Sequence, residues 1–177
     1  MIRIVAVLAL SLFVGGCFEE TVTEKPGPVA MTLEAVGHYC QMNVLEHDGP
    51  KAQIHIAGVT EPLWFSQIRD AVVFTRLPEE TAEITAIYVN DMGRADSWAD
   101  PGADNWVDAE LAFFVIGSSR TGGMGAPEAI PFGMQTDAEA FVAQHGGEVV
   151  RFAEIPEAYV LAPVDTALAG ETDAPVQ

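Results

Sequence analysis

The sequence has few basic residues. Lys and Arg together number 8 in 177 residues, against 26 Asp and Glu, so the formal net charge is −18 at pH 7. Proteins that bind nucleic acid need basic patches that contact phosphates, and anionic lipid head groups attract the same side chains. The composition therefore argues against nucleic acid as a partner and against adsorption to anionic head groups. The acidic residues are scattered, which is typical of a solvated surface.

Long hydrophobic runs are also missing, except at the start of the chain. Residues 4–14 are apolar, follow the positive charge of Arg3, and are too few to span a membrane as a helix. The following Val-Gly-Gly-Cys at 14–17 resembles the bacterial lipobox, in which the cysteine is acylated. We therefore predict a lipoprotein signal peptide over 1–17 with Cys17 as the lipidation site. An ordinary secretory signal peptide is the alternative.

Cysteine is scarce as well, because the chain has only two. If Cys17 carries lipid, Cys40 has no disulfide partner within the chain. Disulfides persist outside the cytoplasm, so a lone thiol there is exposed to oxidation unless something occupies it. A bound metal would protect the thiol of Cys40. A buried, inert cysteine is the alternative.

The residues around Cys40 favour the metal. The segment 37–47 reads Gly-His-Tyr-Cys-Gln-Met-Asn-Val-Leu-Glu-His. Cys40 and Met42 are soft sulfur donors and His38 is an imidazole, a set that suits Cu(I). If this segment is extended, the period of two brings the three side chains to one face. A Cys-x-Met pair alone is a weak signal, so the unpaired thiol and His38 add to it.

Met124 is the natural further donor. It lies among Gly122, Gly123 and Gly125, an unusual place for a core methionine, and such a loop would let the thioether move toward a metal. The alternative is a surface residue in a flexible turn. Met92 and Met134 lie at the boundaries of predicted elements, where we expect packing roles. We expect His55 to be solvated on the polar face of a strand.

The remaining patterns predict an α+β fold. We expect strands at 51–56, 63–65, 83–89, 109–116, 129–132 and 149–152, a helix capped by Ser66 that runs to about Leu77, and a helix that opens with a capping box at 136–139 and ends at His145. Four residues of the first half recur 67 positions later: Phe65, Asp70, Ala71 and Phe74 become Phe132, Asp137, Ala138 and Phe141. The recurrence indicates a duplicated β-β-α-β unit.

This repeat divides the chain as follows. After the signal peptide we expect a tether at 18–30, a first module at 31–90, an acidic connection at 91–108, a second module at 109–164 and a flexible tail at 165–177. The tether and the tail are poor in large apolar residues.

The sequence resembles the NosL family of copper-binding lipoproteins, which are accessory to the assembly of nitrous oxide reductase. The resemblance rests on segments at 37–54, 65–71, 88–95, on Pro-Gly-Ala-Asp-Asn-Trp at 101–106 and on Gly-Gly-Met-Gly-Ala-Pro-Glu-Ala at 122–129. The family usually has Cys-Gly-Met where this chain has Gln41 between the two donors. The donors survive this difference, but glutamine narrows the backbone freedom that glycine would give.

The resemblance implies a Cu(I) carrier with a fold like that of an organomercurial lyase. Cys40 and Met42 would be the primary ligands and Met124 the third, with His38 or water completing the site. The carrier would be periplasmic and anchored by its lipid to the outer or the cytoplasmic membrane, and of the two we expect the outer membrane. It would deliver copper through an ABC-type membrane complex to apo nitrous oxide reductase.

Two other functions remain open at this stage. A thiol-dependent enzyme would use Cys40 as nucleophile and His38 as base, but no third orienting residue is apparent, and we expect no enzymatic activity. A lipid-anchored adaptor would have a purely structural Cys40. Metal content after anaerobic purification distinguishes the carrier from the adaptor, and an assay of thiol-dependent turnover tests the enzyme.

The lipobox leads to the first prediction. We expect the mature protein to begin at an acylated Cys17 and to remain in the membrane fraction, because each buried CH₂ of a lipid chain contributes about 0.8 kcal/mol to anchoring. Intact-mass spectrometry of the membrane fraction measures the modification. A freely soluble protein with an unmodified N-terminus would contradict the prediction.

Overall fold

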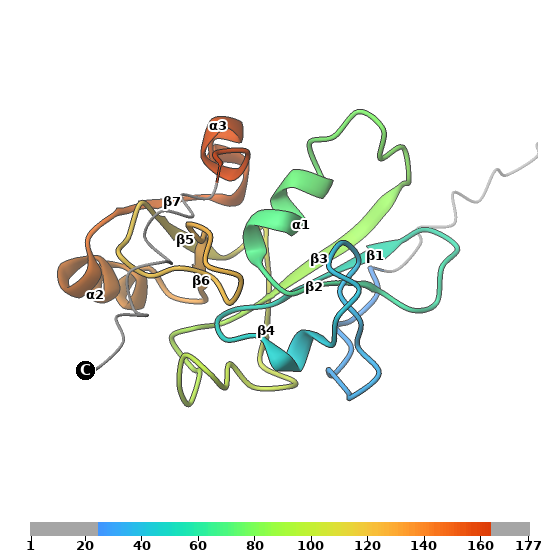
Figure 1. Ribbon diagram of the computed structural model, residues 1–177, viewed down its shortest axis with the longest axis horizontal. Helices are drawn as coiled ribbons and strands as arrows, with labels where there is room; N and C mark the ends of the chain where they lie inside the picture. Colours follow the sequence, from blue (N-terminus) through green and yellow to red (C-terminus); the bar gives the residue numbers. More distant parts are fainter. Residues whose placement is uncertain (1–24, 164–177) are drawn as a thin grey trace, which may run out of the picture.

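The computed structural model describes residues 25–163 and contains two small antiparallel sheets with a helix beside each (Figure 1). The first sheet has the order β2-β1-β3-β4 and the second the order β6-β5-β7. The strands are β1 (Ala52–Ile56), β2 (Leu63–Phe65), β3 (Ile84–Asn90), β4 (Trp106–Asp108), β5 (Phe113–Ile116), β6 (Ile130–Phe132) and β7 (Glu148–Val150). The helices are α1 (Ile68–Phe74), α2 (Gln135–His145) and α3 (Glu157–Val160), with 3₁₀ turns η1 (Val44–Glu46) and η2 (Phe152–Glu154). The predicted α+β class is confirmed.

The structure confirms two similar β-β-α-β modules. In each module the first strand is central: β1 lies between β2 and β3, and β5 lies between β6 and β7. Phe65 and Phe132 each end the second strand and each pair with the first residue of the central strand. Ala71 is the fourth residue of α1 and Ala138 is the fourth residue of α2, and both are fully buried. The offset of 67 residues therefore reflects equivalent positions in two copies of one unit.

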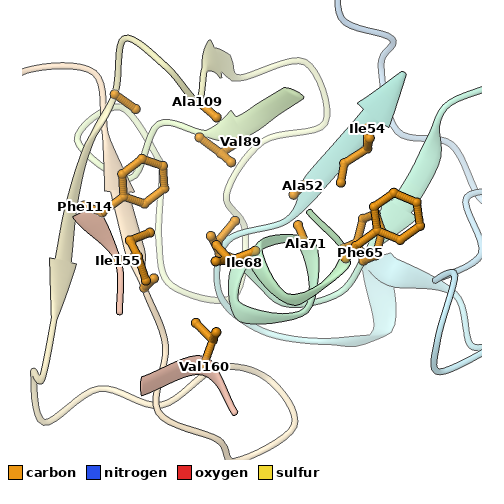
Figure 2. Close-up of a cluster of buried hydrophobic side chains, with 14 of the residues drawn as sticks. Ala52, Ile54, Phe65, Ile68, Ala71, Val89, Ala109, Phe114, Ile155 and Val160 are labelled. Carbon is orange, nitrogen blue, oxygen red and sulfur yellow. The ribbon is translucent and has the colours of Figure 1, made fainter. Parts of the chain in front are cut away.

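The two modules share one hydrophobic core. Its largest cluster joins residues of β1, β2, β3 and α1 to Phe114 and Ile116 of β5 and to Ile155 and Val160 near the C-terminal end of the described chain. Figure 2 shows Ile68 of α1 between Phe114 and Ile155 on one side and Ala52 and Phe65 on the other. α1 thus lies in the middle of the core.

Within residues 25–163, no helix is long and apolar enough to cross a bilayer.

The prediction that His55 is solvated is wrong. β1 was expected to bury one face only, but Gln53 and His55 on the other face are 0% and 4% exposed. The chain at Val29, within the predicted tether, covers this face: Val29 exchanges two 2.8 Å hydrogen bonds with the Gln53 side chain. His55 in turn lies 2.9 Å from the Gln53 side-chain oxygen. Strand periodicity showed two faces and could not show that a distant segment covers the second one.

The connection between the modules also differs from the prediction of a loop over 91–108. Its last three residues form β4, which pairs with β3 and extends the first sheet. The signal peptide with Cys17 and the predicted tail at 165–177 lie outside the described residues.

Both helices begin differently from the prediction. α1 starts at Ile68, after Ser66, and ends at Phe74 rather than at Leu77. α2 starts at Gln135, so the capping box at 136–139 does not form. At α1, a residue of the other module replaces the local cap: the Glu128 carboxyl group accepts hydrogen bonds from the backbone N–H groups of Ile68 and Arg69, at 3.2 and 3.0 Å. A tertiary contact has therefore replaced the local capping signal.

Glu128 and Lys51 are two ionisable residues that are buried in the structure. Each is 1% exposed. Burial raises the pKa of Glu128 to about 8, although the N–H groups of Arg69, Ala129 and Ile68 oppose the shift. Burial lowers the pKa of Lys51 to about 8, opposed by the negative charges of Glu128 and Asp48. Each group therefore holds its charge less readily than it does in water.

These shifts predict how stability depends on pH. Between pH 4.5 and about 8 the folded state keeps a proton on Glu128 that the unfolded chain releases, so the free energy of unfolding falls as pH rises. Between about 8 and 10.5 the unfolded chain keeps a proton on Lys51 that the folded state has lost, so the contribution of Lys51 rises with pH. We expect Glu128→Gln to remove the fall over the first range, measured by urea unfolding at a series of pH values. Lys51→Met, which should remove only the rise, is the control. A Glu128→Gln curve parallel to that of wild type over the first range would contradict the prediction.

Candidate metal centre

The segment around Cys40 is a closed turn, so the prediction that it is extended is wrong. The Gly37 N–H donates to the Met42 carbonyl at 2.8 Å, and the Gln41 N–H donates to the Gly37 carbonyl at 2.9 Å. An isolated antiparallel bridge between Val36 and Asn43 closes the base of the turn. Because the backbone groups pair with each other across the turn, the period-of-two argument for His38, Cys40 and Met42 does not apply.

Gln41 takes the conformation that the turn requires. Its φ is +56°, and it is the only residue other than glycine with a positive φ among residues 25–163. A side chain costs free energy in this left-handed region. The Gln41 amide compensates in part, because its Nε2 donates to the carbonyl of His38 at 2.7 Å and to that of Gly37 at 3.4 Å. A glycine would fit the same conformation without this compensation.

The Cys40 thiol is half-buried beside the strand-to-helix junction of the first module. Its Sγ lies 3.3 Å from the Ser66 Oγ and 4.0 Å from the Met42 carbonyl oxygen. A Cβ on Gly37 would lie only 2.5 Å from the same sulfur, so glycine is needed for the close approach. Cys40 is a free cysteine. It therefore offers one unpaired sulfur with a hydroxyl group within hydrogen-bonding distance.

His38 lies in an aromatic environment. Its ring centroid is 5.0 Å from that of Tyr39, 5.7 Å from that of Phe65 and 5.5 Å from that of Phe74. Its backbone N–H donates to the Trp64 carbonyl at 2.7 Å, which ties the turn to β2. The role of His38 as a ligand stays a prediction.

The two thioethers are accessible. Met42 is 40% exposed and Met124 is 42% exposed. Met134 is 60% exposed, so the expected packing role for it is wrong, whereas Met92 does pack against the core of the second module. The side chains of Met42 and Met124 are thus partly open to solvent, and their roles as ligands stay predictions.

The glycine loop of Met124 packs against the first module next to the Cys40 site. The loop is closed by an N–H···O bond of 2.8 Å from Gly122 to Ala126. A Cβ on Gly122 would lie 2.7 Å from the Gln67 side-chain oxygen, and one on Gly123 would lie 2.5 Å from the Asp48 carbonyl oxygen. Gln67 directly follows Ser66, which contacts Cys40. The thiol and the loop thus contact consecutive residues of the first module, Ser66 and Gln67, just before α1.

The candidate donors in this region are sulfur atoms and one imidazole. The described part of the chain holds no group of three or more His, Cys, Asp and Glu side chains that could bind a metal. The Cys40 thiol lies beside Ser66, Met42 belongs to the same turn, and Met124 belongs to the loop that packs on Gln67. A thiol with thioethers suits a soft monovalent ion.

The sequence did not predict the contacts that Ser66 and Glu128 make in the structure. Ser66 was predicted to cap a helix, yet its hydroxyl faces the Cys40 sulfur. Glu128 was read only as part of a motif, and it binds the start of a helix 59 and 60 residues earlier in the chain. Because both contacts join residues far apart in sequence, no local pattern carries them.

Comparison with known proteins now adds to this geometry. The NosL family model matches residues 28–160. The chain is 52% identical over 166 residues to the copper-binding lipoprotein NosL of Achromobacter cycloclastes, covering 93% of this chain and 86% of the relative. It is 36% identical over 145 residues to the protein of the same description from Stutzerimonas stutzeri, covering 81% and 74%. The crystal structure of the copper chaperone NosL from Shewanella denitrificans is similar with a TM-score of 0.69 at 36% identity, covering 75% of this chain and 97% of that one.

The conformation of Gln41 leads to a prediction on stability. Glycine or asparagine tolerates a positive φ, whereas a β-branched residue does not. We expect Gln41→Gly and Gln41→Asn to stay within about 1 kcal/mol of wild type, and Gln41→Val to lose about 1–3 kcal/mol of unfolding free energy. Urea unfolding at one pH measures the order of stability. A valine variant as stable as the glycine variant would show that the turn does not impose the positive φ.

Proposed function

We propose a function from the premise that this chain belongs to the NosL family. The protein would be a copper metallochaperone, which binds one Cu(I) ion and passes it on without chemical turnover. One observation carries the proposal: the free thiol of Cys40 contacts Ser66 and the glycine loop of Met124 contacts Gln67, the next residue, with the partly exposed Met42 in the same turn as the thiol. The names of the relatives, copper-binding lipoprotein and copper chaperone, support it.

The chemistry of the donors favours Cu(I). A thiolate with thioethers is a soft set that suits Cu(I), whereas Mg²⁺ and Ca²⁺ prefer oxygen donors. In this proposal Cys40 supplies the single anionic ligand, Met42 and Met124 supply neutral sulfur, and His38 or water completes the site. The partial exposure of both methionines would leave room for a partner's donor to approach, as transfer requires.

The chain would act in the periplasm, held to a membrane by lipid on Cys17. The lipobox-like sequence at 14–17 and the lipoprotein description of the relatives support this placement. The outer membrane is favoured over the inner. From there the protein would deliver copper to an ABC-type membrane complex, and through it to the copper centres of apo nitrous oxide reductase during their assembly.

An enzymatic role has less support. A cysteine nucleophile needs a base beside it. The polar contacts of the Cys40 sulfur are the Ser66 hydroxyl and the Met42 carbonyl, neither of which is a general base at neutral pH. The ring neighbours of His38 are aromatic. A carrier uses the same residues without this requirement.

The experiment is a Cu(I) competition against a chromophoric chelator under anaerobic conditions. We expect Cys40→Ser to abolish tight binding, because it removes the only anionic ligand. Met42→Ala and Met124→Ala should each weaken binding by about tenfold or more, equivalent to about 1.4 kcal/mol or more. Met134→Ala is the matched control, because this methionine is exposed and belongs to another segment, at the residue before α2.

The possible results separate the parts of the proposal. If Cys40→Ser holds copper as tightly as wild type, the protein does not bind copper in the proposed way. If Met124→Ala behaves like Met134→Ala, the third ligand lies elsewhere while the Cys-x-Met part stands.

A further inference from the structure

Glu128 connects the two parts of the candidate copper site. It follows the Met124 loop and precedes β6, and it is 1% exposed. A buried carboxyl group needs hydrogen-bond partners. Glu128 finds them at the Ile68 N–H (3.2 Å), the Arg69 N–H (3.0 Å) and the Ala129 N–H (2.9 Å). Two of these three donors belong to the other module.

The position of Glu128 fixes the Met124 loop. An isolated bridge between Thr121 and Pro127 closes the base of the loop just before Glu128. A Cβ on Gly122 would lie 2.7 Å from the Glu128 Oε2, so the loop backbone packs directly on this carboxyl group. The hydroxyl of Tyr159 also donates to the Glu128 carbonyl at 2.9 Å. The residue is thus held from several sides, and the loop is held with it.

The other end of the connection reaches the thiol. Ile68 and Arg69, which donate to Glu128, come directly after Ser66 and Gln67. The Ser66 hydroxyl lies 3.3 Å from the Cys40 sulfur. The short segment 66–69 therefore contacts the thiol at one end and the Glu128 carboxyl group at the other.

We propose that Glu128 is a positioning residue for copper binding: it holds the Met124 loop against segment 66–69, so that the Met124 thioether reaches a metal bound by Cys40. The inference rests on the proposed function. Glu128 itself is not a ligand, because its carboxyl oxygens are buried and occupied by backbone N–H groups. Substituting Glu128 should therefore lower the Cu(I) affinity only when Met124 is present to act as a ligand.

A double-mutant cycle tests this role in the full-length protein, purified anaerobically in detergent. We expect Glu128→Ala to weaken Cu(I) binding by about 10- to 100-fold, similar to Met124→Ala, as is usual when residues that support a ligand are removed. The double variant should bind no more weakly than either single variant, because both remove the same contact. X-ray absorption at the copper edge should count one sulfur neighbour fewer in Glu128→Ala than in wild type. Glu128→Gln, which keeps one acceptor oxygen, should restore most of the affinity.

A second variant reaches the same contact without altering Glu128. Gly122→Ala places a methyl group 2.7 Å from both Gln67 Oε1 and Glu128 Oε2, so the loop or these two side-chain ends must shift and the packing between them is disturbed. We expect the same loss of affinity, again absent in the Met124→Ala background. Gly27→Ala is the matched control, since an added Cβ there meets nothing within 4 Å. This variant decides the test if Glu128→Ala fails to fold.

Two results would overturn the inference. If the losses of Cu(I) binding free energy in the single variants add up in the double variant, Glu128 and Met124 act independently. A folded Glu128→Ala or Gly122→Ala protein with wild-type affinity and sulfur count would show that the loop needs no such support. Either result leaves the proposed function standing provided that Cys40→Ser abolishes binding, so the two proposals fail separately.

Discussion

The arrangement of the whole chain depends on the packing of α1 between the two modules. This helix has only seven residues, too few to be stable alone, so its free N–H groups and its apolar side chains must find partners in the rest of the chain. The second module provides both. Glu128 accepts from the first turn, and Phe114, Ile155 and Val160 belong to the core cluster that includes Ile68. The Cys40 thiol contacts Ser66 and the Met124 loop contacts Gln67, so both segments that carry proposed ligands pack just before α1.

The duplicated architecture has a reciprocal contact at its other strand-to-helix junction. Asp91, just after β3 of the first module, accepts a hydrogen bond of 2.9 Å from the Gly133 N–H, just before α2 of the second. Gly133 leaves no room for a side chain, since a Cβ there would lie 2.5 Å from the Asp91 carboxylate. Glu128 thus accepts hydrogen bonds at the strand-to-helix junction of the first module, and Asp91 accepts one at the corresponding junction of the second. Ser66 and Gly133 occupy equivalent positions, and only the copy with Ser66 has a thiol beside it.

The sequence was informative where a local pattern sets the structure. The offset of 67 residues that relates Phe65 to Phe132 identified the repeat, because each copy keeps the residues that pack between strand and helix. Cys40, Met42 and Met124 were predicted as ligands from their chemistry and from the glycines around Met124, and these roles stay predictions. The structure shows that the segments of Cys40 and Met124 contact the consecutive residues Ser66 and Gln67.

The remaining features depend on contacts between distant segments. The Cys40 turn closes on its own backbone, which no side-chain pattern records. His55 is buried because a segment about 25 residues earlier covers β1, as the bonds between Val29 and Gln53 show. The local capping signals at Ser66 and at 136–139 were not used, and at α1 the Glu128 carboxyl group took their place. Periodicity identifies the faces of an element and says nothing of what will cover them.

If Cys17 carries lipid, the contact of the N-terminal segment with the first sheet limits how far the proposed copper site lies from the membrane. The described residues begin at Lys25, whose ammonium group pairs with Asp108 of β4. Eight peptide links separate Cys17 from Lys25, and even fully extended they span at most about 26–29 Å. A protein anchored through lipid on Cys17 is therefore confined to a thin layer above its bilayer and searches for its partner in two dimensions. A partner embedded in the opposite membrane must itself extend across the gap to receive the metal.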